Sequence, residues 1–131
     1  ISLQPTYADV WQAKADALFN IHRHEESIIC YKQSLQLSPD NIDCVIDCIH
    51  TYIELHQYED AKQLIDSYII DYAHNADLLY ESARVYAYLG NNQVAINQLK
   101  SSHSLEHRSI EEIKKDFPDL FSEEDLLQFF I

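Results

Sequence analysis

The fold is decided by the stretch IDCVIDCIHTYIELHQYEDAKQLI, residues 42–65. From Val45 to Ile53 its apolar residues recur three and four positions apart, which is the spacing of one face of an α-helix. The spacing breaks once near the middle of the stretch and then resumes. This pattern predicts a helix, a short turn and a second helix.

The same arrangement recurs along the chain. The spacing between equivalent positions is constant and equals the separation of Trp11 from Val45. Equivalent positions keep their size class: Trp11, Val45 and Leu79; Leu18, Tyr52 and Tyr86; Ser27, Ala61 and Ala95; Tyr31, Ile65 and Leu99. A fixed period of a few tens of residues is typical of repeated helical hairpins, which must pack on their neighbours because one hairpin cannot bury both of its faces. We therefore expect a row of similar hairpins.

Small residues mark the start of each second helix, at Ser27, Ala61 and Ala95. A bulky side chain there would hold the two helices of a hairpin apart, so we expect close antiparallel packing at these positions. The large residues of the equivalent first helices then fill the space between one hairpin and the next.

These columns resemble the tetratricopeptide repeat family, whose pattern is Trp, two residues, Leu-Gly, two residues, Tyr, then Ala, three residues, Phe, and a closing Pro. The first unit matches through Trp11, Leu18 and Pro39, whereas Ile49 and Tyr68 depart from the pattern. The resemblance implies an all-α fold, an α-solenoid of stacked antiparallel helix hairpins that forms a right-handed superhelix.

The resemblance and the period together predict the organisation of the chain. We expect the remnant of a preceding repeat at 1–7, three repeats at 8–41, 42–75 and 76–107, and C-terminal capping helices at 108–131. Beyond His107 the period is expected to fail, and the segments that begin at Ser109 and Ser122 each offer a capping-box start for a short helix, with a break at Pro118. Residues 1–5 resemble the end of a second helix whose hairpin is missing, and the sequence has no methionine, so we expect it to be a piece of a longer protein with more repeats or another domain upstream.

Composition excludes several classes of partner. The 22 acidic and nine basic residues give a formal charge of −13, which would repel the phosphates of nucleic acid and an anionic membrane surface. We therefore expect neither nucleic acid nor membrane as a partner.

Three cysteines, an odd number, argue against a disulfide framework and favour a reducing compartment such as the cytoplasm.

The sequence offers little for catalysis or metal binding. A single glycine excludes a glycine-rich phosphate loop, and neither a nucleophile elbow nor a His-Glu-x-x-His motif occurs. Cys44 and Cys48 lie one helical turn apart, as do His103 and His107, but core packing and a helix end explain these pairs better than a metal ion does. We expect no enzyme activity, cofactor or metal.

The first helices of the hairpins line the concave face in the family that the chain resembles, and this implies that a peptide would bind there. The residues whose spacing turns them outward are Asp9, Gln12, Asp16, Phe19, Asn20, Asp43, Ile46, Asp47, His50, Glu54, Asp77, Tyr80, Glu81, Arg84 and Tyr88. They include seven carboxylates and one arginine. The face therefore lacks the lysines with which the chaperone-adaptor subfamily clamps acidic C-terminal peptides.

These residues predict a protein-interaction module, a scaffold or adaptor that holds a basic or polar polypeptide segment in an acidic groove. The acids could equally serve only to solvate an exposed helical face. A second hypothesis is a structural spacer or self-association element, in which the apolar tail from Phe117 to Ile131 forms a homo-oligomer.

Overall fold

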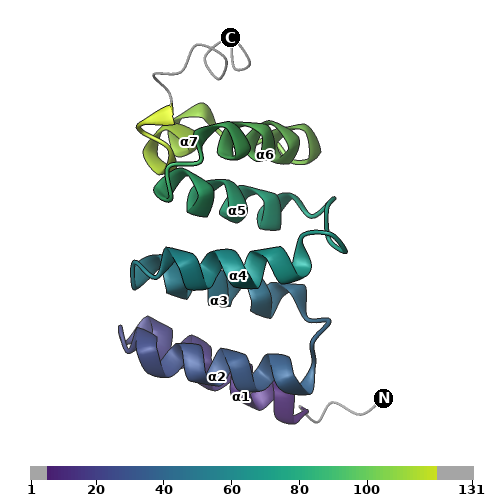
Figure 1. Cartoon of the computed structure of the whole chain (residues 1–131). Coiled ribbons are helices and arrows are strands. Elements are labelled where there is room, and N and C mark those ends of the chain that lie inside the picture. Colours follow the sequence, from purple (N-terminus) through teal and green to yellow (C-terminus); the bar gives the residue numbers. More distant parts are fainter. Residues whose placement is uncertain (1–5, 121–131) are drawn as a thin grey trace. The chain divides into compact units, whose positions relative to one another are not determined.

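The computed structural model describes residues 6–120, which form seven α-helices (Figure 1). The helices are α1 (Tyr7–Asn20), α2 (His24–Leu37), α3 (Ile42–Glu54), α4 (Tyr58–Tyr68), α5 (Ala76–Tyr88), α6 (Asn92–Leu105) and α7 (Ile110–Asp116). No strand occurs in the described range 6–120, and none of its helices has the length and apolar character that crossing a membrane requires. The prediction of an all-α helical repeat is confirmed.

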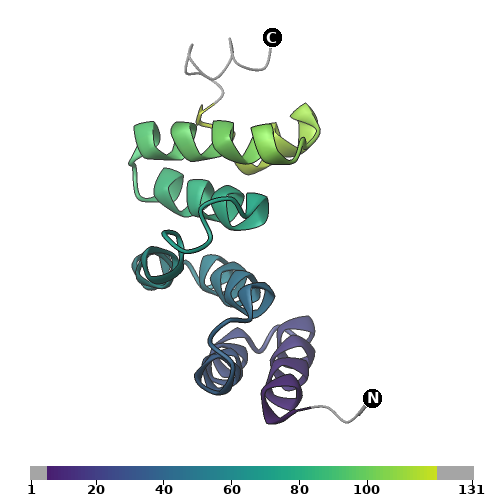
Figure 2. The ribbon, with the colours of Figure 1, turned by 90° about the vertical axis from the view of Figure 1, so that its right-hand side faces the viewer.

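The chain divides into two compact units, Ile1–Ala61 and Lys62–Ile131, and the boundary lies within α4. In the first unit α1 packs against α2, and α2 packs against α3. In the second unit α5 packs against α6. Figure 2 shows each of these two hairpins as a pair of neighbouring helices. Of the predicted terminal features, most of the repeat remnant and the capping box at Ser122 lie outside the described residues.

The small residues near the start of each second helix are buried where the helices pack, as their sizes predict. Ser27, Ala61 and Ala95 are all completely buried. The Ser27 hydroxyl donates a hydrogen bond of 2.8 Å to the backbone carbonyl of Ala15. This bond satisfies the buried hydroxyl and joins α2 to α1 at the point where the helices approach each other.

Two further serines join the hairpins in the same way. The hydroxyls of Ser34 and Ser102 donate to the carbonyl oxygens of Ala8 and Ala76, both at 2.8 Å. In each hairpin the serine lies on the second helix and the carbonyl on the first turn of the first helix. Tyr68 occupies the corresponding column of the middle repeat, so this bond belongs to the outer two repeats.

Replacing Ser102 with alanine is expected to lower the free energy of unfolding by about 1 kcal/mol, because the partly buried carbonyl of Ala76 loses its side-chain donor. Urea unfolding followed by circular dichroism would measure the loss. Ser101→Ala is the matched control, since the exposed Ser101 hydroxyl bonds only within its own helix. Equal losses in the two variants would contradict a role for the bond between helices.

The turn inside each hairpin has the same backbone conformation. His22, His56 and Gly90 occupy equivalent positions of successive repeats and have φ angles of 62°, 58° and 85°. In all three turns this residue and the next donate N–H bonds to carbonyls three and five positions back, as in a Schellman helix end. The only glycine of the chain therefore lies where a left-handed backbone is required, and two histidines accept the same conformation elsewhere.

The repeat continues one helix further than the sequence indicates. Asn41, Asn75 and Ser109 are separated by the same constant shift, and each accepts a hydrogen bond from the backbone N–H three positions later. The cap predicted at Ser109 is thus present at the start of α7, in register with the caps of the preceding repeats. The capping residue Ser109 and the buried Ile113 still occupy the positions of Asn75 and Leu79 in the preceding repeat. The residues between Ser109 and Ile113 no longer match that repeat.

α7 is part of the core of the second unit. Its residue Ile113 and the following Phe117 and Leu120 are at most 2 % exposed. They form one apolar cluster with side chains of α5 and α6: Tyr80, Ala83, Ala95, Ile96 and Leu99. The segment after His107 therefore covers the last complete hairpin.

Candidate functional site

A pocket in the first unit contains five of the residues predicted to bind a partner. It has a volume of about 330 Å³ and is lined by Asp16, Phe19, Asn20, Tyr31, Asp47 and His50. The first three residues come from α1, Tyr31 comes from α2, and the last two come from α3. Residues from three helices therefore share one site.

Helical spacing explains why these side chains meet. Asp16 lies three and four positions before Phe19 and Asn20, and Asp47 lies three positions before His50. Such residues share one face of a helix. The packing of α2 against both α1 and α3 adds Tyr31 to the lining of the same pocket.

Tyr31 is the lining residue that the sequence did not predict as functional. Its ring is 2 % exposed, in keeping with its place in a packing column. Its hydroxyl, however, donates a hydrogen bond of 2.5 Å to an Asp16 carboxylate oxygen, Oδ1. Its phenol group is the sequence feature that could have revealed this role, because the equivalent positions of the other repeats hold Ile65 and Leu99. A buried tyrosine hydroxyl needs a polar partner.

The two carboxylates of the pocket repel each other. Burial raises the pKa of Asp47 above its ordinary value, and the nearby charge of Asp16 raises it further. His50 and a hydrogen bond from Gln12 act in the opposite direction. Burial and the bond to Asp16 likewise raise the pKa of Tyr31, so this phenol remains a donor. A cation in the pocket would relieve the repulsion.

The other predicted residues of the first unit lie outside the pocket lining. Asp9 forms a capping box with Thr6, the N-cap of α1, and the two residues exchange hydrogen bonds of 3.1 and 3.2 Å. Gln12 accepts a bond of 2.9 Å from the Asn41 amide and is partly buried. Of the rest, Asp43 and Glu54 are exposed, and Ile46 is partly buried.

In the second unit the chain itself covers part of the predicted binding face. Tyr80 is 2 % exposed, and its hydroxyl donates to the carboxylate of Asp116. The ring of Phe117 meets the Tyr80 ring edge to face, with centroids 5.3 Å apart. The Arg108 guanidinium carbon lies 3.9 Å from the Tyr80 ring centroid, and its Nη2 atom pairs with Asp77 at 2.7 Å. Tyr80 is therefore not the exposed anchor that its spacing predicts, because spacing does not reveal what covers a face.

Glu81 is also buried, at 5 % exposure, and forms an ion pair of 3.0 Å with Arg84. Tyr88 remains 51 % exposed. Arg84 and Tyr88 border a smaller pocket of about 140 Å³, whose walls also include Phe117 and Leu120. The predicted residues of this unit thus divide between ion pairs, core contacts and a minor pocket.

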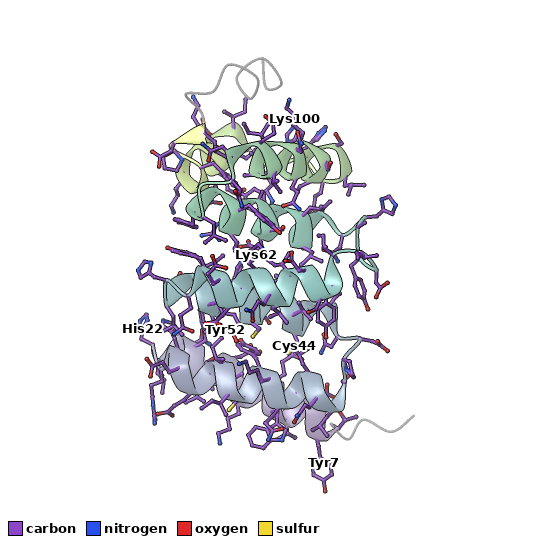
Figure 3. The ribbon with its side chains drawn as sticks, viewed as in Figure 1. Tyr7, His22, Cys44, Tyr52, Lys62 and Lys100 are labelled. Atoms are coloured by element: carbon purple, nitrogen blue, oxygen red, sulfur yellow. The ribbon has the colours of Figure 1, made fainter. Side chains whose placement is uncertain are left out.

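Cysteines and histidines do not assemble a metal site in the part of the chain that the structure describes, since no group of three or more ligating residues is suitably placed there. Cys44, labelled in Figure 3, is completely buried, and burial raises its pKa to about 11. Burial raises the pKa of Cys48 to about 12. The rings of His103 and His107 stack with centroids 4.4 Å apart. Core packing therefore accounts for the two cysteines.

Two models of the tetratricopeptide repeat match the chain, at residues 8–41 and 30–74. Among solved structures, the first TPR of Spaghetti (RPAP3) bound to HSP90 peptide SRMEEVD is 16 % identical, with a TM-score of 0.79 and coverage of 98 % of each chain. The first TPR domain of human RPAP3 is 18 % identical, with a TM-score of 0.77 and coverage of 93 % of this chain and 98 % of that one.

A third structure, MamA from Desulfovibrio magneticus RS-1, is 13 % identical, with a TM-score of 0.77, and the match covers 94 % of this chain and 71 % of that one. A search of the curated proteins finds no match. The two family models together span residues 8–74, about half of the chain. The matches agree with the recurring helix caps, turns and small-residue columns, and the chain belongs to the tetratricopeptide repeat family.

Proposed function

We propose that the chain is a protein-interaction module and that its pocket in the first unit binds a basic segment of a partner polypeptide. The observation that carries the proposal is the convergence of Asp16 and Asp47, from two helices, in one pocket whose lining residues include no lysine or arginine. Burial and the nearby charge of Asp16 make the ionised form of Asp47 costly. A positively charged side chain would supply the missing charge.

The solved relatives support peptide binding, but the charge of their peptide differs from that of the segment we propose. The first and second TPR of Spaghetti (RPAP3) are each bound to the HSP90 peptide SRMEEVD. That peptide carries three acidic residues and one arginine. The pocket of the present chain has negative charge where an acidic peptide would need positive charge, so we expect it to select a basic segment instead.

The geometry favours binding over the two other interpretations. Acids that only solvate a helix would point into open water, whereas Asp47 is partly buried beside Asp16. For self-association, the described part of the tail contributes Phe117 and Leu120, and both are buried in their own unit. Residues 121–131 of the tail lie outside the described range.

A peptide-display selection would test the proposal. The full chain is immobilised and presented with a library of short random peptides at low and high salt. We expect the retained peptides to be enriched in lysine and arginine, and we expect raised salt to release them, because attraction between partly exposed charges is screened. Enrichment of acidic peptides, or a neutral set that salt does not release, would overturn the proposal.

A further inference from the structure

We infer that the residue which the pocket captures is an arginine, held between Asp16 and Asp47 with its guanidinium plane against Phe19. This inference rests on the proposed function, and it specifies the partner side chain. It is supported by an arginine of the chain itself, which is held against α5 in the second unit.

That internal example is Arg108. Its guanidinium carbon lies 3.9 Å from the centroid of the Tyr80 ring, on α5. Its Nη2 atom pairs with Asp77 of α5 at 2.7 Å, and its Nη1 atom pairs with Glu112 of α7 at 3.0 Å. Two carboxylates from different helices and one aromatic ring thus hold one guanidinium, whose side chain is only 22 % exposed.

The pocket of the first unit has the same types of group but no lysine or arginine among its lining residues. Asp16 and Asp47 supply two carboxylates from different helices, and Phe19 supplies a partly buried ring. The Phe19 ring packs against His24 with centroids 4.8 Å apart, which limits its movement. The pocket volume of about 330 Å³ also leaves room for a long side chain.

Arginine suits this arrangement better than lysine. The Tyr31 hydroxyl already bonds to one oxygen of Asp16, and a ligand that spans the pocket can bond to the other oxygen and to Asp47. A guanidinium has five N–H donors in a planar fork, and it can bridge two carboxylates while its face stacks on an aromatic ring. An ammonium is a compact, strongly hydrated charge that gains less from the ring.

The test is a titration of the full chain, followed in amide ¹H–¹⁵N spectra, with N-acetyl-arginine amide, N-acetyl-lysine amide and N-acetyl-citrulline amide. We expect the arginine probe to shift the signals of Asn20, Asp47 and His50, and to bind at least about threefold more tightly than the lysine probe. Citrulline has almost the shape of arginine without its charge, and it should leave these signals unmoved.

The variant Phe19→Leu keeps an apolar side chain but removes the ring. In this variant we expect the dissociation constant for arginine to rise towards that for lysine, while the lysine value stays the same. Lysine binding as tight as arginine binding in the unmodified chain would overturn the arginine inference and leave the proposed function standing. If neither charged probe shifts these signals, both proposals fail.

Discussion

The variant Phe117→Ala is expected to lower the free energy of unfolding by about 3–5 kcal/mol, the range measured for removal of a buried phenylalanine ring. Phe117 is 2 % exposed and meets the Tyr80 ring edge to face. Its loss would leave a cavity between α7 and the last complete hairpin, and it would also expose Tyr80. Urea unfolding of the full chain, followed by circular dichroism, would measure the loss.

A matched control comes from the other end of the same short helix. Ile110 is an apolar residue that is 43 % exposed, so Ile110→Ala should cost less than about 1 kcal/mol. A similar small cost for Phe117→Ala would show that α7 contributes little to the stability of the second unit. Sedimentation of both variants also tests the self-association hypothesis. If Phe117 forms part of a dimer interface, Phe117→Ala should convert a dimer into a monomer.

The repeat itself could be predicted from the sequence because packing restricts side-chain size. Ser27, Ala61 and Ala95 are completely buried where two helices approach closely, so only small residues fit. The left-handed turn residues were harder to recognise, because His22 and His56 replace the glycine that would reveal the conformation. Periodicity therefore identified the hairpins more reliably than turn composition did.

The candidate site could be predicted only in part, because helical spacing specifies which residues share a face but not what packs on that face. On α1 and α3 the spacing correctly grouped Asp16 with Phe19, and Asp47 with His50. On α5 it proposed Tyr80, which the segment after His107 covers. The whole of α6 separates that segment from α5 in the sequence, and nothing in the spacing of α5 indicates its position.

The double substitution Asp16→Lys with Asp47→Lys is expected to weaken binding of a basic peptide at least about 100-fold. It replaces two attractive charges with two repulsive ones inside the same pocket, and like charges brought together at an interface cost several kcal/mol. Fluorescence anisotropy with a labelled peptide from the display selection would measure the change. Glu59→Lys with Asp60→Lys reverses two exposed charges of the same unit outside the pocket lining, and it should weaken binding much less.

The single variant Asp47→Asn separates the function of this carboxylate from its effect on stability. Because the pKa of Asp47 is raised in the folded chain, its ionised form opposes folding, and stability falls as the pH rises through that raised pKa. Asparagine cannot ionise, so the variant should gain about 0.5 kcal/mol at neutral pH, the size of a partly exposed charge interaction, while it binds a basic peptide less tightly.

Binding should have the opposite pH dependence to stability. A cationic peptide is attracted to the ionised carboxylate, so its affinity should decrease as the pH falls through the raised pKa of Asp47, whereas the affinity of Asp47→Asn should vary less over that range. Equal pH dependence in the two proteins would show that Asp47 does not contact the ligand. A carboxylate that costs stability in the free chain and contributes affinity in the complex is better explained by selection for binding than by solvation of a helix.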